Sequence, residues 1–364
     1  MQAQPRLVQV RRRASEVRAE GSVWPEVRRI LVSRVDPLRP LVLALPALAA
    51  LREAYPGAWL GLLVRPTTAA FARLVSGVDQ VLEAPSDASG VAEVLGKFRP
   101  DLLVSMSAGG RIPWAAATAR VPHRVGPSGR VYSPLFERRA EIAPGKDAPA
   151  HEVEQALALA QRSGARAGEA RFPIALLDSA TALCREWLEE HRVRPPFVVL
   201  RGESCGGCSS WPAGHFARLA TLLAAEGVRV VFSVGPGDGA TAEALDAADV
   251  RVRKAPRFTG DPPSLAAFLR SAALVVGNGT GAVHLAAALG TPVLMLHAPW
   301  RTCGPERWGP YAANGWALVA DAPGADRWSP RERARLGPEL MATISPAAAL
   351  SSVLAMLEGG APRF

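Results

Sequence analysis

The chain has 364 residues, 49% of them hydrophobic and 21% charged, which is enough for about two domains with buried cores. This composition excludes a disordered or fibrous protein, and the longest apolar run, residues 41–51, is too short for a membrane-spanning helix of about 20 residues. The net charge of +9 fits a solvated arginine-rich surface or an anionic partner, whereas no zinc-finger spacing, RNP-like motif or basic heptad helix points to nucleic acid.

Residues 1–29 contain dense arginines without apolar periodicity, and we expect a basic tail there. Such a tail is either a solvated arm or an arm that contacts anionic lipid at the inner face of a membrane. No apolar segment typical of a signal peptide follows it, and the four cysteines form no disulfide framework. The expected location is therefore the cytoplasm.

From residue 30, short apolar runs alternate with helical stretches, which is typical of parallel βαβ units with helices on both faces of a sheet. The predicted strands lie at residues 30–35, 58–64, 78–83 and 101–106, and the predicted helices at 38–54, 68–75, 91–98 and 112–119. A Pro/Gly-rich stretch at 122–150 and a helix at 151–163 complete a first α/β domain over residues 30–175.

An interdomain connection is expected at residues 176–196, with a helix at 179–191. A second alternation then predicts strands at 197–201, 229–234, 250–253, 274–277 and 293–296, with helices at 214–226, 240–248, 263–271 and 280–289. It forms a second domain over residues 197–345, and a closing helix at 347–357 lies in the C-terminal segment 346–364. Open sheets of this kind bind ligands outside the carboxyl ends of their strands, so the cleft between the two halves is the expected site.

The stretch from Leu274 to Pro292 carries the strongest signal for a ligand site. A strand ends there in Asn278-Gly-Thr-Gly281, and a helix begins. Thr280 suits the N-cap, and the glycines on either side of it let a ligand approach the backbone. The free N–H groups and the helix dipole favour a diphosphate at this point, with His284 one turn further on. An ordinary strand–turn–helix with a packed His284 is the alternative.

A second stretch, residues 200–212, follows the first strand of the second half. Ser204 and Ser209 can donate hydrogen bonds to phosphate oxygens there. Cys205 and Cys208 have the spacing of redox or metal sites, and Cys303 is a further candidate ligand. Plain loop cysteines are the alternative.

Two other loops of the second half offer candidate contacts. In residues 297–310, Trp300 and Trp308 could stack on a base or sugar, and Arg301 and Arg307 could bind phosphate. Residues 235–238, Gly-Pro-Gly-Asp, resemble a phosphate loop but lack the acidic residue that follows in dinucleotide-binding folds. The alternatives are a loop that packs on itself at residues 297–310 and an ordinary strand-to-helix turn at residues 235–238.

In the first half, Asp36 is the only carboxylate of the loop that follows the first strand. It could act as a base toward a sugar hydroxyl, or it could cap the next helix with Pro37 at the first helical position. Arg124 and Arg130 could hold a phosphate or carboxylate of an acceptor, and a solvated loop is the alternative.

These stretches, in this order, resemble the family-9 glycosyltransferases, the group of the ADP-heptose:lipopolysaccharide heptosyltransferases. The matching pieces are Ile30–Pro46, His151-Glu-Val-Glu154, Trp211–Leu219 and Asn278–Pro292, within residues 30–360. The resemblance implies a GT-B fold, in which two Rossmann-like domains face each other across a cleft. It further implies that the N-terminal domain holds the acceptor, that the C-terminal domain holds the nucleotide-sugar, and that the anomeric centre is inverted without a metal or other cofactor.

The resemblance also assigns roles on the acceptor side. The family carries Gly-Asp just before its first helix, and that Asp is the proposed base. Arg39 and Pro40 occupy those positions here, so Asp36, upstream of them, is the remaining candidate for the catalytic base.

On the donor side, the match retains Thr280, Gly281 and His284. Gly279 replaces the family's motif Asp, and Ser209 replaces its phosphate-binding Lys. Ser204 stands where the family uses a phosphate-binding hydroxyl, and the adjacent Cys205 joins the expected donor contacts.

The sequence therefore predicts a heptosyltransferase-like enzyme of lipopolysaccharide or other glycoconjugate biosynthesis. It would pass a sugar from a nucleotide-sugar, ADP-linked in the family, to a hydroxyl of a glycolipid or small-molecule acceptor. The replaced positions favour an alternative of another class, a member that has lost catalysis and serves as a nucleotide-binding or partner subunit.

Overall fold

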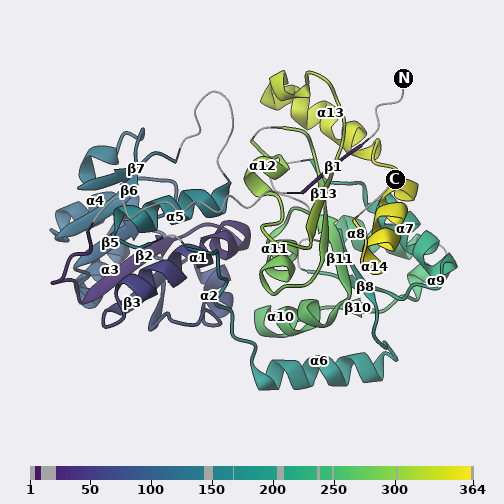
Figure 1. Cartoon of the computed structure of the whole chain (residues 1–364), viewed down its shortest axis with the longest axis horizontal. Helices are drawn as coiled ribbons and strands as arrows, with labels where there is room; N and C mark the ends of the chain where they lie inside the picture. The colour runs from purple at the N-terminus through teal and green to yellow at the C-terminus, as the bar shows by residue number, and fades with distance from the viewer. Residues whose placement is uncertain are drawn as a thin grey trace. The chain divides into compact units, whose positions relative to one another are not determined.

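The computed structural model describes residues 5–9, 22–142, 151–166, 168–202, 209–235, 238–247, 250–300 and 302–361. The chain divides into two compact units (Figure 1). Residues 13–175 form the N-terminal unit, and residues 1–12 together with 176–364 form the C-terminal unit. Each unit is built around its own mainly parallel sheet with helices on both faces, as the alternation in the sequence predicts.

The sheet of the N-terminal unit is parallel throughout and has the order β4-β3-β2-β5-β6-β7. Its strands are β2 (Arg29–Arg34), β3 (Trp59–Val64), β4 (Gln80–Glu83), β5 (Leu102–Ser105), β6 (His123–Pro127) and β7 (Arg138–Ala140). Its helices are α1 (Leu38–Ala54), α2 (Pro66–Ala72), α3 (Ala88–Phe98), α4 (Arg111–Thr118) and α5 (Glu152–Arg162).

The central strands β2, β3 and β5 are buried over most of their length, because helices cover both faces of the sheet there. On one face, α3 and α4 bury Leu31, Leu63 and Leu103. On the other, α1 packs against α5, and every residue from Leu41 to Leu48 is buried. Helix α1 is therefore an interior helix, which fixes the start of the helix and the loop that precedes it at the carboxyl end of β2.

The C-terminal unit has seven strands in the order β1-β13-β12-β11-β8-β9-β10. They are β1 (Arg6–Val8), β8 (Val198–Arg201), β9 (Val230–Ser233), β10 (Arg257–Phe258), β11 (Leu274–Asn278), β12 (Val293–His297) and β13 (Gly315–Val319). The helices are α6 (Asp178–Glu190), α7 (Ala213–Ala225), α8 (Gly239–Asp246), α9 (Val250–Arg253), α10 (Pro262–Ser271), α11 (Gly281–Ala288), α12 (Pro305–Trp308), α13 (Pro330–Ala342) and α14 (Pro346–Leu357).

The core on one face of this sheet is formed with α7, α13 and α14. Trp211 and Phe216 meet Leu294 of the sheet, and Met341 and Val353 close the cluster. The helices α10, α6 and α11 pack beside one another on the other face.

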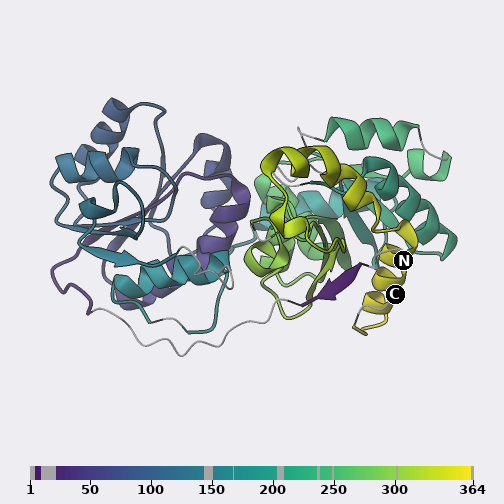
Figure 2. The ribbon, with the colours of Figure 1, turned by 90° about the horizontal axis from the view of Figure 1, so that it is seen from above.

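The expectation of a basic tail at residues 1–29 is wrong for the described part of that segment. Strand β1 pairs antiparallel with β13, with Leu7 opposite Leu318 (Figure 2). Pairing satisfies the backbone groups that would otherwise be exposed at the edge of β13. The arginine at the start of β1 does not prevent this pairing, because a three-residue strand joins the edge of a sheet through its backbone alone.

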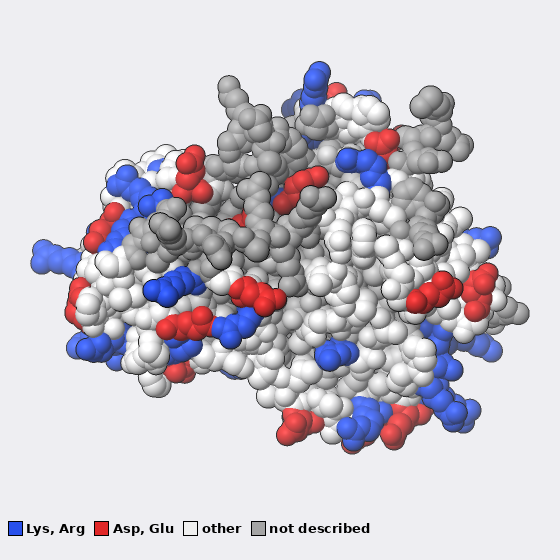
Figure 3. Space-filling view, in the orientation of Figure 1, with Lys and Arg blue, Asp and Glu red and all other residues white. Residues whose placement is uncertain are grey.

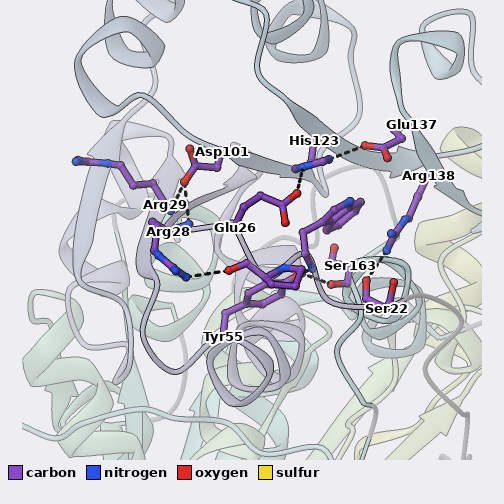
Figure 4. Close-up of polar contacts among 12 residues, drawn as sticks. Ser22, Glu26, Arg28, Arg29, Tyr55, Asp101, His123, Glu137, Arg138 and Ser163 are labelled. Atoms are coloured by element: carbon purple, nitrogen blue, oxygen red, sulfur yellow. Dashed lines mark hydrogen bonds and ion pairs between the residues drawn. The ribbon is translucent and has the colours of Figure 1, made fainter.

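Residues 22–29 are also packed, against the N-terminal unit (Figure 4). Trp24 is 8% exposed, and its ring stacks on His123 at a centroid distance of 4.5 Å. The Arg138 guanidinium lies over the Trp24 ring, 3.5 Å from the centroid. Tyr55 accepts a hydrogen bond from the backbone N–H of Trp24 at 3.2 Å, and burial raises the pKa of this tyrosine.

Carboxylates provide further contacts that hold residues 22–29 in place. Glu26 and Glu137 lie on the two sides of the His123 ring, 3.0 and 2.9 Å from its nitrogens. A backbone hydrogen bond, assisted by His123, lowers the pKa of Glu26. Asp101 accepts hydrogen bonds from two successive backbone N–H groups at the start of β2, both 2.8 Å long (Figure 4). The arginines within residues 22–29 therefore belong to a segment that is fixed by these contacts. Residues 10–21 lie outside the described part of the chain.

Helix α6 differs from the expected interdomain connection, because it packs into the C-terminal unit. Ala180 and Cys184 face inward, and the Trp187 ring meets Phe258 and Phe268 edge-on at 5.2 and 5.7 Å. One apolar stripe on an otherwise charged helix is enough to attach it to α10.

Several elements also differ from the sequence prediction. The expected strand at 250–253 is helix α9, and the strand lies at β10 instead. The Pro/Gly-rich stretch contains β6 and β7, whose few apolar residues give no strand signal. Strand β13 and helix α13 were not predicted either, because Pro and Gly residues surround them in the sequence.

Within the described residues, no single helix is both long enough and apolar enough to cross a membrane. The pair α13 and α14 meets such a test only jointly, and its two helices are bent by 63°. Figure 3 shows positive and negative side chains interspersed over the face that it draws, apart from the grey atoms. The net positive charge is therefore not gathered into one basic area on that face.

Candidate functional site

The strongest candidate of the C-terminal unit lies where β11 ends and α11 begins. Thr280 occupies the N-cap of α11, but its side chain makes no capping hydrogen bond. This residue is 5% exposed, and its hydroxyl oxygen has no hydrogen-bond partner among the described residues. An uncapped helix start with a buried, unsatisfied hydroxyl is suited to an anion, because the first backbone N–H groups and the hydroxyl can all donate.

The strand end ahead of this turn is held by the loop before α7. The Asn278 side-chain oxygen accepts a hydrogen bond from the backbone N–H of Trp211 at 2.8 Å, and the Trp211 ring nitrogen donates to the carbonyl of Ile344 at 2.8 Å. His215 stands edge-on to the Trp211 ring at 5.3 Å. Burial lowers the pKa of His215, and a hydrogen bond with the Ile344 backbone partly offsets this lowering. The segment Trp211–His215 thus anchors the site.

His284 lies inside α11, where all residues from Ala282 to Ala287 are buried. Its side chain is 1% exposed, and its backbone N–H donates to the carbonyl of Thr280 at 3.1 Å. The helix is therefore covered on all sides, and contact between His284 and a ligand stays a prediction.

Gly279 has a neighbour that the sequence does not reveal. A Cβ at this position would lie 2.8 Å from Cε1 and 3.1 Å from Nε2 of His297. His297 ends β12, is 3% exposed, and its Nδ1 lies 3.2 Å from the carbonyl oxygen of Cys303. The imidazole therefore takes up the volume beside position 279 that a longer side chain would need.

This packing predicts that Gly279→Ala is destabilising although it adds a single methyl group. We expect a loss of about 1–3 kcal/mol in the free energy of unfolding, because a buried ring must move. The measurement is urea unfolding of Gly279→Ala, His297→Ala and the double variant. The loss caused by Gly279→Ala should largely disappear in the His297→Ala background.

Gly214→Ala is the matched control, since nothing lies within 4 Å of the added Cβ in α7. That change should be neutral or stabilising. Equal losses from Gly279→Ala in both backgrounds would show that His297 does not limit the space at position 279.

The other donor-side candidates are only partly described, because Ser204, Cys205 and Arg301 lie outside the described residues. Ser209 packs against Gly337 of α13, where a Cβ would collide with its hydroxyl. The same glycine would bring its Cβ within 2.8 Å of the Trp300 ring. Helix α13 therefore covers both residues closely.

The expectation that Trp300 stacks on a base or sugar is wrong. Its side chain is 2% exposed and belongs to the core of the unit, together with Met341. Trp308 is 8% exposed and donates its ring N–H to the carbonyl of Thr302 at 3.0 Å, while the Arg307 guanidinium lies 4.9 Å from the centre of its ring. A large apolar ring gains more from burial under a helix than from exposure in a loop, and here the loop packs on itself.

The loop after β9, where the sequence suggests a phosphate loop, is tied to Arg201 in its described residues. Arg201, at the end of β8, is 6% exposed, donates to Ser233 at 2.8 Å, and has Nη2 3.8 Å from Asp238. Asp238 accepts a hydrogen bond from the N–H of Gly235 at 2.6 Å. The loop that the sequence suggests as a phosphate loop is therefore held by the buried ion pair between Arg201 and Asp238.

Cysteine chemistry is described only in part, since Cys205 and Cys208 lie outside the described residues. Cys303 is disulfide-bonded, so it offers no thiolate to a metal in this structure. Cys184 is free and buried. Among the described residues, no group of three or more His, Cys, Asp or Glu side chains is placed to hold a metal ion.

In the N-terminal unit, the loop after β2 is organised by Arg34, which is 6% exposed. Its guanidinium is paired with Glu152 at the start of α5, donates to the carbonyl of Met106, and donates to the carbonyl of Pro40 at 3.2 Å. Asp36 lies 3.6 Å from the Arg34 Nε. One buried cation thus ties two loops and the start of α5 together.

Asp36 does not cap α1, because the N-cap is Pro37 and no side-chain capping hydrogen bond is present. The Asp36 side chain is 24% exposed, and its Oδ2 is buried without a hydrogen-bond partner among the described residues. The position of the Asp36 side chain is therefore set by its ion pair with Arg34 and not by a helix cap.

A pocket that the sequence analysis missed lies beside this loop, at the carboxyl ends of β2 and β5. It has a volume of about 240 Å³ and is lined by Val35, Ser105, Ser107, Ala108, Gly109, Gly110, Arg111 and Ile112. Ser107 accepts a hydrogen bond from the N–H of Val35 at 2.6 Å, and this joins the two loops. The run of Ser and Gly directly after an apolar strand is the sequence signal that could have revealed it.

The two arginines expected on the acceptor side differ in their surroundings. Arg124 donates to the carbonyl of Leu135 at 2.7 Å and also to that of Val121, so its guanidinium is used to hold a turn. Arg130 is exposed in the loop after β6. The Arg124 guanidinium is therefore engaged within the unit, whereas Arg130 is exposed, and a contact of Arg130 with an acceptor stays a prediction.

Comparison with known proteins agrees with this architecture. The family model of glycosyltransferase family 9 (heptosyltransferase) matches residues 117–329. Lipopolysaccharide heptosyltransferase 2 of Salmonella typhimurium is 29% identical over 193 residues, which are 50% of this chain and 55% of that protein. The chain thus aligns with about half the length of this curated relative.

Solved structures share the fold. A family-9 glycosyltransferase of Veillonella parvula has a TM-score of 0.80 at 18% identity, over 93% of this chain and 100% of the other. E. coli ADP-heptose lps heptosyltransferase II has a TM-score of 0.73 at 18% identity, over 91% and 99%. E. coli heptosyltransferase WaaC with ADP has a TM-score of 0.65 at 19% identity, over 92% and 99%. The chain has the GT-B architecture of two Rossmann-like units and belongs to glycosyltransferase family 9, the heptosyltransferase family.

Proposed function

We propose that this protein is an inverting glycosyltransferase that moves a sugar, a heptose by analogy, from an ADP-linked donor to a hydroxyl of an acceptor. The observation that carries the proposal is the uncapped start of α11 with its buried Thr280 hydroxyl. In the relatives, WaaC is described with ADP and with ADP-2-deoxy-2-fluoro heptose. A nucleoside diphosphate is the anion that such a helix start suits.

In this proposal the C-terminal unit binds the donor. The first N–H groups of α11 and the Thr280 hydroxyl donate to the diphosphate, joined by the hydroxyls of Ser204 and Ser209, with Cys205, Gly279 and His284 beside them. As the bond between the anomeric carbon and the diphosphate oxygen breaks, negative charge grows on the leaving diphosphate. Fixed donors at a helix start stabilise that charge without a bound cation.

The N-terminal unit binds the acceptor, with the pocket lined by Ser105 and Ser107 as the place for a hydroxylated group. Asp36 takes the proton of the attacking hydroxyl while its oxygen bonds to the anomeric carbon. Attack from the face opposite the leaving diphosphate inverts that carbon. Glu152 is a poorer candidate for the base, because it is hydrogen-bonded to the buried Arg34 and its side chain is 8% exposed, whereas Asp36 lies 3.6 Å from that guanidinium and is 24% exposed.

Two observations support a second candidate function, a nucleotide-binding partner subunit without transfer. His297 fills the space beside Gly279, and α13 covers Ser209. Both are positions at which the family pattern has a charged side chain. This candidate predicts nucleotide binding without turnover.

The test of the donor site is calorimetric titration with ADP, UDP and GDP, with and without magnesium. We expect micromolar binding of one nucleotide, independent of magnesium. Thr280→Val should weaken that binding about 10-fold or more, because a hydrogen bond to a charged phosphate is lost. Its free energy of unfolding should be unchanged or higher, since the hydroxyl has no described partner in the protein.

Thr291→Val is the matched control. The Thr291 hydroxyl is buried and donates to the carbonyl of Leu269 at 3.0 Å, so its loss should cost about 1 kcal/mol of stability and leave nucleotide affinity unchanged. Failure of all three nucleotides to bind would refute a working donor site. Binding without sugar transfer to any acceptor would favour the partner-subunit function.

A further inference from the structure

The chain passes between its two units twice. Strand β1 belongs to the C-terminal unit, residues 13–175 form the N-terminal unit, and residues 176–364 belong to the C-terminal unit again. The second crossing leads directly into α6, whereas α14 near the chain end packs on α7 of its own unit. Chain continuity therefore gives the two units a second covalent link, between β1 and residue 22.

The end of this link on the N-terminal unit is anchored at Trp24. The ring of Trp24 contacts both His123 and the Arg138 guanidinium, and Arg138 also donates to the carbonyl of Ser22 at 2.8 Å (Figure 4). The backbone beside Trp24 runs close over Gly164, which has a φ of +88°. A Cβ on Gly164 would lie 2.5 Å from the backbone nitrogen of Val23, so the segment fits only against a glycine there.

The other end of the link is anchored in the C-terminal unit by β1. All three residues of β1 pair with β13, and Leu7 also packs against the apolar core of that unit. Directly after the strand, the Gln9 side-chain amide donates to the carbonyl of Ala313 at 2.7 Å. Backbone pairing, apolar contact and a side-chain hydrogen bond therefore hold this end together.

The two links reach opposite edges of the C-terminal sheet. Strand β1 is the first strand in the sheet order, whereas α6 contacts β10, the last strand, through the rings of Trp187 and Phe258. Seven strands at about 4.8 Å spacing place these edges about 29 Å apart. One short link permits rotation in every direction, whereas a second link attached elsewhere restricts rotation. Residues 9 and 22 cannot separate by more than about 47 Å, the contour length of the chain between them.

We propose that the N-terminal segment is a tether that limits the relative motion of the two units, with β1 and the contacts of Trp24 as its two fixed ends. Each anchor lies within a single unit, so breaking the tether should leave the fold of both units intact. The inference does not depend on sugar transfer. If donor and acceptor do bind to different units, a broken tether should also lower turnover.

Cutting the link tests this proposal on the full-length chain. A site-specific protease sequence replaces residues 14–19, and spin labels are carried by non-natural amino acids at Ala92 of α3 and Ala224 of α7, which are both exposed. We expect cleavage to broaden the distribution of label distances in pulsed electron paramagnetic resonance about two-fold or more, because the second restraint is lost. The matched control has the same protease sequence at residues 143–148, whose two ends both belong to the N-terminal unit, and its cleavage should leave the distribution unchanged.

A single substitution tests the anchor at Trp24. Gly164→Ala should broaden the distance distribution as cleavage does, because the added methyl group displaces Val23. Gly129→Ala is the matched control: Gly129 also has a positive φ, of +71°, but nothing lies within 4 Å of the added Cβ. It carries the same kind of backbone strain without the collision, so the distribution should not change. Circular dichroism checks that both variants fold, and Trp24→Ala replaces Gly164→Ala if that variant does not.

Three outcomes would overturn the proposal. The first is an unchanged distance distribution after the cut at residues 14–19, and the second is equal broadening by the control cut. The third is a dimer in light scattering that becomes monomeric on cleavage, which would show that β1 pairs with β13 of a second copy. Nucleotide titration is independent of all three, so a failure here is distinguishable from failure of the proposed function.

Discussion

Replacing Asp36 with asparagine should lower the turnover of sugar transfer by about 10²–10⁴-fold, because the amide cannot accept the proton of the acceptor hydroxyl. Nucleotide affinity should stay the same, since the proposed donor contacts all belong to the C-terminal unit. The fold should tolerate the change, because Asp36 caps no helix and the buried Arg34 beside it keeps Glu152 as a hydrogen-bonded partner. The measurement is kcat with a saturating donor, beside calorimetry with the nucleotide.

Asp87→Asn is the control for this substitution. Asp87 caps α3 by accepting a hydrogen bond from the N–H of Gly90 at 3.1 Å, and asparagine caps a helix equally well. Turnover of that variant should match the unmodified protein. If Asp36→Asn retains full turnover, the base lies elsewhere.

Replacing Arg34 with methionine should cost about 3–5 kcal/mol of unfolding free energy, the largest stability change that we expect in the protein. The side chain is buried beside Glu152 and Asp36, so its removal leaves buried negative charge without a partner. The double variant Arg34→Met/Glu152→Leu should recover part of the loss, because it removes the stranded carboxylate as well. Urea unfolding at neutral pH compares these two variants with the unmodified protein.

An exposed ion pair gives the comparison. Arg73 and Glu83 lie 3.2 Å apart, with side chains 58% and 48% exposed, and Arg73→Met should cost at most about 1 kcal/mol. A loss from Arg34→Met no greater than that from Arg73→Met would mean that the buried pair does not organise the loops at the end of β2. Because Asp36 lies beside Arg34, the variant should also lower turnover, which links the stability of this cluster to the placement of the proposed base.

Position 279 shows how one departure from the family pattern is accommodated. The sequence reveals only that glycine stands where the family has aspartate. The structure adds that the His297 ring occupies the neighbouring volume, so restoring the aspartate alone would create a clash. The two positions are far apart in sequence and have to be considered together.

The features that the sequence determined by itself are those set by local patterns. The bounds of α1 agree with the predicted helix, because the apolar run at residues 41–51 lies between Pro37 and the turn at Tyr55, which leaves little freedom in where the helix starts and stops. The alternation of apolar runs and helical stretches predicts two mainly parallel α/β units, because period and length are properties of each segment. The turn after β11 was also predictable, since a strand that ends in Gly-Thr-Gly before a helix is a local signal.

Tertiary structure decided the features that depend on partners distant in sequence. Strand β1 exists because the edge of β13 is available to pair with it, and no property of three residues could show that. Trp300 is buried because α13 covers it, although the sequence around it is typical of an exposed loop. The pocket beside Asp36 forms because β2 and β5 are neighbours, which brings two loops together at one end of a sheet. Local sequence sets the type of each element, whereas long-range pairing and packing decide which of its side chains are covered and which remain available for chemistry.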